Sequence, residues 1–101
     1  MKIDFLDTKL IVKTTKEFNK NYKKILRQGK DVSKLHYVVN KIANGERLDL
    51  CYRNHKLVDD GIYKNCYECH ISPDWLLIYR YDGDNLVLVL INTGSHSDLF
   101  K

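Results

Sequence analysis

The sequence has little of what marks several large protein classes. It contains one proline, five glycines and three cysteines among 101 residues. This composition excludes low-complexity and fibrous chains, and no apolar run reaches the 18 or more residues of a membrane-spanning helix. The first residues also lack the apolar segment of a secretory signal. We therefore expect one globular domain over residues 1–101, cytoplasmic, with reduced cysteines and no membrane contact.

Positive charge is concentrated in the first half of the chain. Residues 1–50 carry 12 basic and 6 acidic side chains, a net charge of +6, whereas residues 51–101 carry 5 and 7, a net charge of −2. The whole-chain charge of +4 hides this division. Charge gathered on one element focuses a field that a mixed surface cancels, so the first half indicates a polyanionic partner.

The basic half predicts two amphipathic helices joined by a short turn. Thr14 or Thr15 caps the first helix, over residues 16–28. Its apolar stripe consists of Phe18, Tyr22, Ile25 and Leu26. Its cationic flank includes four candidate ribosome-binding residues: Lys16, Lys20, Lys23 and Lys24. Asp31 caps the second helix, which ends at Asn44-Gly45, so the pair forms an antiparallel hairpin.

The remaining segments predict strands and turns. Strands are expected over residues 9–13, 62–71, 75–81 and 86–91, with turns at 72–74 and 82–85. Residues 46–61, which contain Asp59-Asp60-Gly61, and the last residues from 92 onward are expected to be loops. The fold class is therefore α+β, with the N-terminal helical hairpin packed on a small, mainly antiparallel sheet.

The run Cys66-Tyr67-Glu68-Cys69-His70 has the C-x-x-C-H spacing of c-type haem attachment and contains potential zinc ligands. Its setting argues against both groups. In a strand, positions i and i+3 point to opposite faces, and the chain has only one such cysteine pair. We expect Cys69 to pack under the helices, Cys66 to lie on the other face, and the protein to need no metal or other cofactor.

Three loop-proximal histidines, His55, His70 and His96, together with Asp74 are the candidate catalytic residues. Imidazole titrates near neutrality, so such a set can supply both a general base and a general acid. These groups suit metal-independent cleavage of RNA, in which one takes the proton of a ribose 2′-OH and another protonates the departing 5′ oxygen. Taken alone, any one of these loop histidines is more often an ordinary surface residue than a catalytic one. His36, within the second helix, is expected to be a surface residue.

Aromatic residues near this set have two possible roles. Trp75, Tyr79 and Tyr81 can stack on splayed RNA bases or pack in the core. Phe100, close to the C-terminus, is expected to dock into the fold or to contact a ligand.

Three segments carry a specific resemblance to a known family. They are His55-Lys56-Leu57, the run from Glu68 to Tyr79 (ECHISPDWLLIY), and the run from Thr93 to Phe100 (TGSHSDLF). In these segments the sequence resembles the YafQ-like branch of the RelE/ParE superfamily of type II toxins. The resemblance covers residues 9–100.

This resemblance implies a RelE-like, microbial-ribonuclease-like fold and an mRNA interferase that cleaves mRNA in the ribosomal A site without a metal. It assigns catalysis to His55, His70, Asp74 and His96, and a site-shaping or nucleotide-positioning role to Trp75 and Phe100. Relatives often have arginines where this chain has Tyr67 and Asn92. Arg53 and Lys56, with Lys64 and Arg80 as further alternatives, are therefore candidates to bind the substrate phosphate in their place.

The same resemblance implies a RelB/DinJ-type antitoxin as partner, with which the toxin forms a complex that binds operator DNA. The sequence is also consistent with two other functions. The absent arginines are consistent with a catalytically weakened module that binds antitoxin or ribosome without efficient cleavage. A ParE-like gyrase inhibitor on the same fold is the other alternative, although the intact histidine and aspartate set disfavours it.

Overall fold

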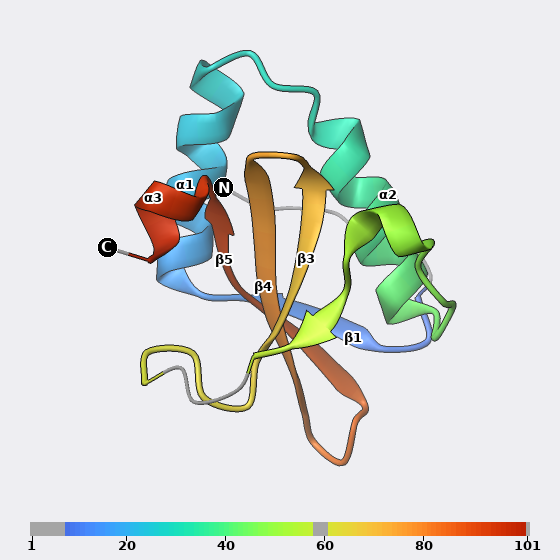
Figure 1. Ribbon diagram of the computed structural model, residues 1–101. Helices are drawn as coiled ribbons and strands as arrows, with labels where there is room; N and C mark the ends of the chain where they lie inside the picture. The colour runs from blue at the N-terminus through green and yellow to red at the C-terminus, as the bar shows by residue number, and fades with distance from the viewer. Residues whose placement is uncertain (1–7, 58–60, 101) are drawn as a thin grey trace.

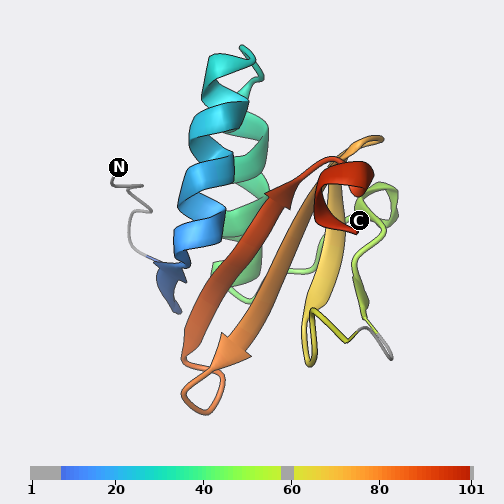
Figure 2. The ribbon, with the colours of Figure 1, turned by 90° about the vertical axis from the view of Figure 1, so that its left-hand side faces the viewer.

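A five-stranded sheet with two helices on one face forms the body of the protein in the computed structural model, which describes residues 8–57 and 61–100. Figures 1 and 2 show the helices packed side by side against the sheet. The elements in chain order are β1 (Ile11–Thr14), α1 (Lys16–Arg27), α2 (Val32–Ala43), the 3₁₀ helix η1 (Leu50–Tyr52), β2 (His55–Lys56), β3 (Tyr67–Ser72), β4 (Trp75–Asp82), β5 (Val87–Gly94) and α3 (His96–Leu99).

The strand order is β1-β5-β4-β3-β2. β1 runs parallel to β5, and every other neighbouring pair is antiparallel. The central hairpin of β4 and β5 carries a bulge between the pairs Ile78–Asn92 and Tyr79–Leu90, so Ile91 is the extra residue on β5. The predicted α+β class, with a helical hairpin on a mainly antiparallel sheet, is confirmed.

The helices begin where the caps predict. The Thr15 hydroxyl accepts a hydrogen bond from the Phe18 amide at 3.0 Å, and Asp31 accepts one from the Ser33 amide at 3.0 Å. The apolar stripe of α1 is buried except for Leu26, which is 41% exposed. Among the described residues, no helix is long and apolar enough to cross a membrane.

His36 is partly buried between the two helices, which corrects its prediction as a surface residue. Its Nε2 lies 2.8 Å from the Tyr22 hydroxyl, and the two rings stack at 6.0 Å. Burial lowers the pKa of His36 below the ordinary value for histidine, because the charged imidazolium loses hydration there. The residue therefore ties α2 to α1.

The two faces of the sheet support separate apolar clusters. The face under the helices holds the main core, which includes Cys69, Trp75, Leu77 and Tyr79. The outer face holds a smaller cluster of Tyr63, Cys66, Leu76, Ile78 and Leu99, onto which α3 packs. Cys69 and Cys66 thus lie on opposite faces of the sheet, as predicted. Tyr79 packs in the main core, with Tyr81 against it, rather than offering a surface for RNA.

Three boundaries differ from the sequence prediction. The strand expected over residues 62–71 begins only at Tyr67, because Tyr63 turns aside into the outer cluster and Asn65 adopts a positive φ of 60°. The loop expected over 46–61 contains η1 and β2, and its Asp59-Asp60 pair lies outside the described residues. The terminal loop contains the end of β5 and α3. All the added elements are short and depend on long-range contacts.

Candidate functional site

The outer face of the sheet carries the candidate catalytic residues of the strands. Glu68 and His70 alternate with the core residues Cys69 and Ile71 on β3, so both start from this face. On β2, His55 pairs directly with Glu68 and shares its face. Lys56 pairs with Tyr67 and therefore starts from the opposite face, although it is exposed. Strand register thus brings His55 and His70 together and places Lys56 apart from them.

Glu68 joins the two histidines. Its Oε1 lies 3.4 Å from His70 Nε2 and 3.7 Å from His55 Nε2. The Glu68 side chain is 10% exposed, while the two histidine side chains are more open, at 23% for His70 and 51% for His55. The carboxylate therefore forms the floor of a small cluster in which each imidazole, when protonated, can donate to the same oxygen.

The orientation of His55 follows from its second ring nitrogen. His55 Nδ1 lies 2.7 Å from the backbone carbonyl oxygen of Arg53. A carbonyl oxygen only accepts, so Nδ1 carries the hydrogen, and Nε2 is the atom available for proton transfer. Arg53 adopts a left-handed conformation, with φ 49°, at the end of η1. This local turn aims its carbonyl at the histidine.

Asp74 and His96 form a second group where β4 begins and α3 starts. The His96 backbone amide donates to Asp74 Oδ1 at 3.4 Å, and the His96 ring lies 4.8 Å from the Phe100 ring. Phe100 also packs edge-on against Tyr63 at 5.5 Å, and the Tyr63 hydroxyl donates to the Leu99 carbonyl at 3.1 Å. Phe100 therefore docks into the fold and at the same time supports His96.

The short helix α3 is held by its own cap and by a glycine. Ser95 and Asp98 form a capping box, and their hydrogen bonds lower the pKa of Asp98 below its usual range. Gly94 adopts φ 155°, and a Cβ there would lie 3.3 Å from the Asp98 Cβ. These constraints fix the direction in which the chain leaves β5, and so the position of His96.

Trp75 belongs to the main core rather than to the open face. It is 3% exposed, and its indole N–H donates to the Thr93 hydroxyl at 2.9 Å. That hydroxyl in turn donates to the Leu76 carbonyl at 2.7 Å, which ties the start of β4 to the end of β5. Lys30 Nζ lies 5.8 Å from the ring centroid. Trp75 is thus placed to position Asp74 and the strand that leads to His96.

The apolar residue Leu76 on β4 separates the His55–Glu68–His70 cluster from Asp74 and His96. His70 pairs with Leu76, and Leu76 pairs with Gly94, two residues before His96. Two inter-strand spacings place the Cα atoms of His70 and Gly94 about 10 Å apart. The site is therefore a face with the His55–Glu68–His70 cluster on one side of Leu76 and Asp74 with His96 on the other, and the described contacts do not join the two directly.

Tyr67 and Asn92, which stand where relatives often have arginines, lie in different parts of the structure. Tyr67 stacks on Tyr79 at 5.5 Å on the helix side of the sheet, away from His70. Asn92 lies on the outer face, where its Nδ2 donates to the Tyr63 hydroxyl at 3.4 Å and its Oδ1 accepts from Asn21. Neither residue supplies charge, so any fixed positive charge near the histidines comes from elsewhere.

Two of the predicted cationic residues, Arg53 and Lys24, lie beside the site. Arg53 is exposed and lines the same hollow as His70. Lys16, Lys20, Lys23 and Lys24 are all exposed on α1. Lys24 Nζ lies 3.6 Å from Asp98 Oδ1, so this lysine reaches α3 beside His96. The cationic flank of α1 therefore extends to the edge of the site.

Glu68 is the residue that the sequence interpretation missed. A signal was present, because Glu68 and His70 are two positions apart in a predicted strand and must share a face. Its pairing with His55 had no signal, since β2 is only two residues long. Among the described residues, no group of three or more His, Cys, Asp or Glu side chains is arranged to hold a metal ion.

Comparison with known proteins agrees with this architecture. The sequence profile described as "Bacterial toxin of type II toxin-antitoxin system, YafQ" matches residues 10–101. The mRNA interferase toxin YafQ of Escherichia coli K12 is 32% identical over 85 residues, which cover 83% of this chain and 88% of that protein.

Solved structures show the same likeness. A metal-bound toxin from Helicobacter pylori has a TM-score of 0.82 and 37% identity, covering 90% of this chain and 99% of the other. The toxin in the Escherichia coli DinJ–YafQ toxin–antitoxin complex has a TM-score of 0.80 and 29% identity, covering 92% and 99%. The match of the profile to nearly the whole chain, on a fold shared with these toxins, shows that the chain belongs to the YafQ family of bacterial type II toxin–antitoxin toxins.

Proposed function

We propose that this protein is an mRNA interferase, an endoribonuclease that inhibits translation by cutting mRNA in the ribosomal A site. The observation that carries the proposal is the His55–Glu68–His70 cluster on one side of Leu76, with Asp74 and His96 on the other, where the His96 backbone amide donates to Asp74. Two proton-transfer groups flanking one position are what phosphodiester cleavage requires. The family relatives named mRNA interferase toxins support the same reading.

The proposed reaction is an internal transesterification. A base on one side of the site removes the proton of the ribose 2′-OH, and the 2′ oxygen attacks the adjacent phosphorus. The bond from phosphorus to the 5′ oxygen breaks, and an acid on the other side protonates that oxygen. The products are a 2′,3′-cyclic phosphate and a 5′-OH, so the reaction consumes no water. We assign His96 to proton transfer, with His55, His70 and Asp74 sharing the acid–base and orienting roles.

Primer extension on mRNA from cells expressing the protein without antitoxin tests this proposal. We expect translation arrest and new 5′-OH ends within translated mRNA, and His96→Ala is expected to abolish both. Ser97→Ala is the matched control, because Ser97 is the exposed neighbour of His96 on α3. Stalled ribosomes without new 5′ ends would instead indicate the binding-only alternative, and DNA damage with intact mRNA would indicate gyrase inhibition.

The cationic face of α1 is the proposed ribosome-binding surface. Lys16, Lys20, Lys23 and Lys24 are exposed, and rRNA is a dense polyanion. Replacing the four lysines with glutamine is expected to weaken co-sedimentation with ribosomes and to reduce its salt dependence, while the circular dichroism spectrum stays the same. Lys13→Gln, on exposed β1, is the control. Unchanged binding of the fourfold variant would show that these lysines are only a solvated face.

A DinJ-type antitoxin is the proposed protein partner, since a related toxin is seen in complex with DinJ. We propose further that the toxin–antitoxin complex binds operator DNA. Co-expression of the toxin with the product of a short neighbouring reading frame is expected to restore growth and to yield a co-purifying complex. A mobility-shift assay with the upstream DNA then tests operator binding. A neighbouring product that neither rescues growth nor binds the toxin contradicts the assignment.

A further inference from the structure

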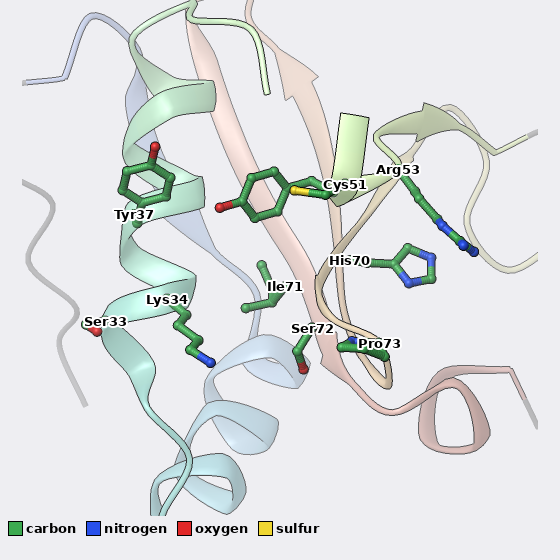
Figure 3. A pocket seen from close by; sticks show the side chains of 10 residues that line it. Ser33, Lys34, Tyr37, Cys51, Arg53, His70, Ile71, Ser72 and Pro73 are labelled. Carbon is green, nitrogen blue, oxygen red and sulfur yellow. The ribbon is translucent and has the colours of Figure 1, made fainter. Parts of the chain in front are cut away.

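A cavity of about 920 Å³ adjoins the catalytic face, and most of the residues that line it have no role in the function described above. It lies between α2, η1 and the turn that joins β3 to β4 (Figure 3). Figure 3 shows Tyr37 and Lys34 on one side and Arg53 and His70 on the other. This volume is within the range of sites that bind small ligands.

One wall of the cavity is aromatic. The rings of Tyr37 on α2 and Tyr52 on η1 lie 6.5 Å apart with an interplanar angle of 35°. Tyr37 is 49% exposed, and Lys41 Nζ lies 5.5 Å from the centroid of its ring. Tyr52 is half-buried. A flat π system that packs on an exposed ring such as that of Tyr37 gains stacking energy whatever its exact identity. The wall therefore suits a nucleobase.

The polar lining of the cavity favours an anion. Lys34 and Arg53 both line it, and none of the described residues that line it is acidic. The left-handed turn at Arg53 brings this arginine to the cavity from the end of η1. A cationic hollow with an aromatic wall matches a nucleotide, which combines a flat base with a phosphate, better than it matches an apolar peptide.

The cavity is continuous with the catalytic cluster, because His70 both lines it and contacts Glu68. We propose that the cavity binds the nucleotide next to the scissile phosphate, with its base on Tyr37 and Tyr52 and its phosphate near Lys34 and Arg53. This proposal rests on the proposed ribonuclease function. It makes Tyr37 and Tyr52 residues that hold the RNA in register with the histidines and that influence which base is accepted.

Cleavage kinetics of Tyr37→Ala on ribosome-bound mRNA test this subsite. Stacking of one base changes binding by roughly 5- to 150-fold, so KM is expected to rise within this range while kcat changes little. Tyr37→Phe retains the ring and is expected to keep the wild-type KM. Leu50→Ala is the control, because Leu50 is 96% exposed next to η1's Cys51 but does not line the cavity. Tyr37 is exposed on a helix, so its loss leaves the core intact.

Cys51 provides a second measurement, since it is the one exposed cysteine of the three and lines the cavity. The rate at which a maleimide alkylates Cys51 is measured for the toxin bound to two kinds of stalled ribosome, and the two rates are compared. One carries mRNA with 2′-deoxyribose in the A-site codon, which cannot be cleaved, and the other carries mRNA that ends at the P site. We expect A-site RNA to slow alkylation at least fivefold, and Tyr37→Ala to remove most of this protection.

The outcomes separate the two proposals. A wild-type protein that does not cut ribosome-bound mRNA refutes the proposed function itself. Normal cleavage together with an unchanged KM in Tyr37→Ala and unprotected Cys51 refutes the nucleotide subsite alone. Protection of Cys51 by the antitoxin but not by A-site RNA also refutes it, and assigns the cavity to the antitoxin interface.

Discussion

Replacement of Trp75 by phenylalanine separates a positioning role from direct contact with RNA. Trp75 is 3% exposed, and its indole N–H donates a 2.9 Å hydrogen bond to the buried Thr93 hydroxyl. Phenylalanine removes the N–H and part of the ring. The hydrogen bond is worth about 1 kcal/mol, and the smaller ring costs about as much as one or two buried methylene groups at ~0.8 kcal/mol each.

We therefore expect Trp75→Phe to lower the free energy of unfolding by about 2 kcal/mol. For a domain of this size, Tm falls by about 10 °C. Urea titration and thermal unfolding, both followed by circular dichroism, measure these changes. Below the new Tm, cleavage of ribosome-bound mRNA is expected to stay within about tenfold of wild type, because the indole does not reach the substrate.

A double-mutant cycle with Thr93→Val isolates the hydrogen bond. Thr93 also donates to the Leu76 carbonyl, so its replacement has an added cost of its own. The two substitutions together are expected to cost about 1 kcal/mol less than the sum of the single effects, since they break the same bond. A Trp75→Phe protein with unchanged stability and no cleavage would refute this reasoning and indicate that the indole stacks on RNA.

Three further predictions follow from described contacts. Glu68→Gln is expected to lower the cleavage rate by about 100-fold while the protein stays folded, because the group that joins His55 and His70 loses its charge. Primer extension measures the cleavage rate, and circular dichroism shows whether the fold is kept. Maleimide at pH 8 is expected to label Cys51 alone in the native protein, because burial raises the pKa of Cys69 to about 12 and Cys66 is also buried. Peptide mass spectrometry identifies the labelled cysteines. Rapid labelling of Cys69 would contradict the structure. Burial lowers the pKa of His36 in the folded protein below the ordinary value of 6.5. As the pH falls below 6.5, His36 in the unfolded chain therefore takes up a proton more readily than in the folded protein. The free energy of unfolding is expected to decrease until the pH reaches the lowered pKa of the folded state. His36→Gln should remove this part of the pH dependence in urea titrations, and an identical slope in both proteins would show that His36 does not contribute.

The long elements were predictable because their signals are local. Caps at Thr15 and Asp31 and the apolar stripes define α1 and α2 within one or two residues. The short elements were not. β2 has two residues and exists only by pairing with β3, and α3 has four residues whose helical turn is held by a capping box and by packing on the outer cluster. A local pattern of two to four residues is too short to distinguish these elements from a loop.

The residues of the site were named from sequence, but their division into two groups was not. His55, His70, Asp74 and His96 carry the family motif and are readable without coordinates. The shared contact with Glu68 depends on the register of β2 against β3, and the distance to His96 depends on the order β3-β4-β5. Register and strand order are set by long-range pairing, which no local spacing encodes.

The sequence by itself determined the family and the two helices and supplied the candidate acid–base residues, because motif identity, caps and apolar periodicity are written in neighbouring positions. Only the tertiary structure decided that Trp75 lies in the core and that Glu68 is the floor of the histidine cluster. It also decided that Tyr37 and Tyr52, from separate elements, face one cavity beside His70. These outcomes depend on which elements pack together, and that is settled by burial and pairing across the whole domain.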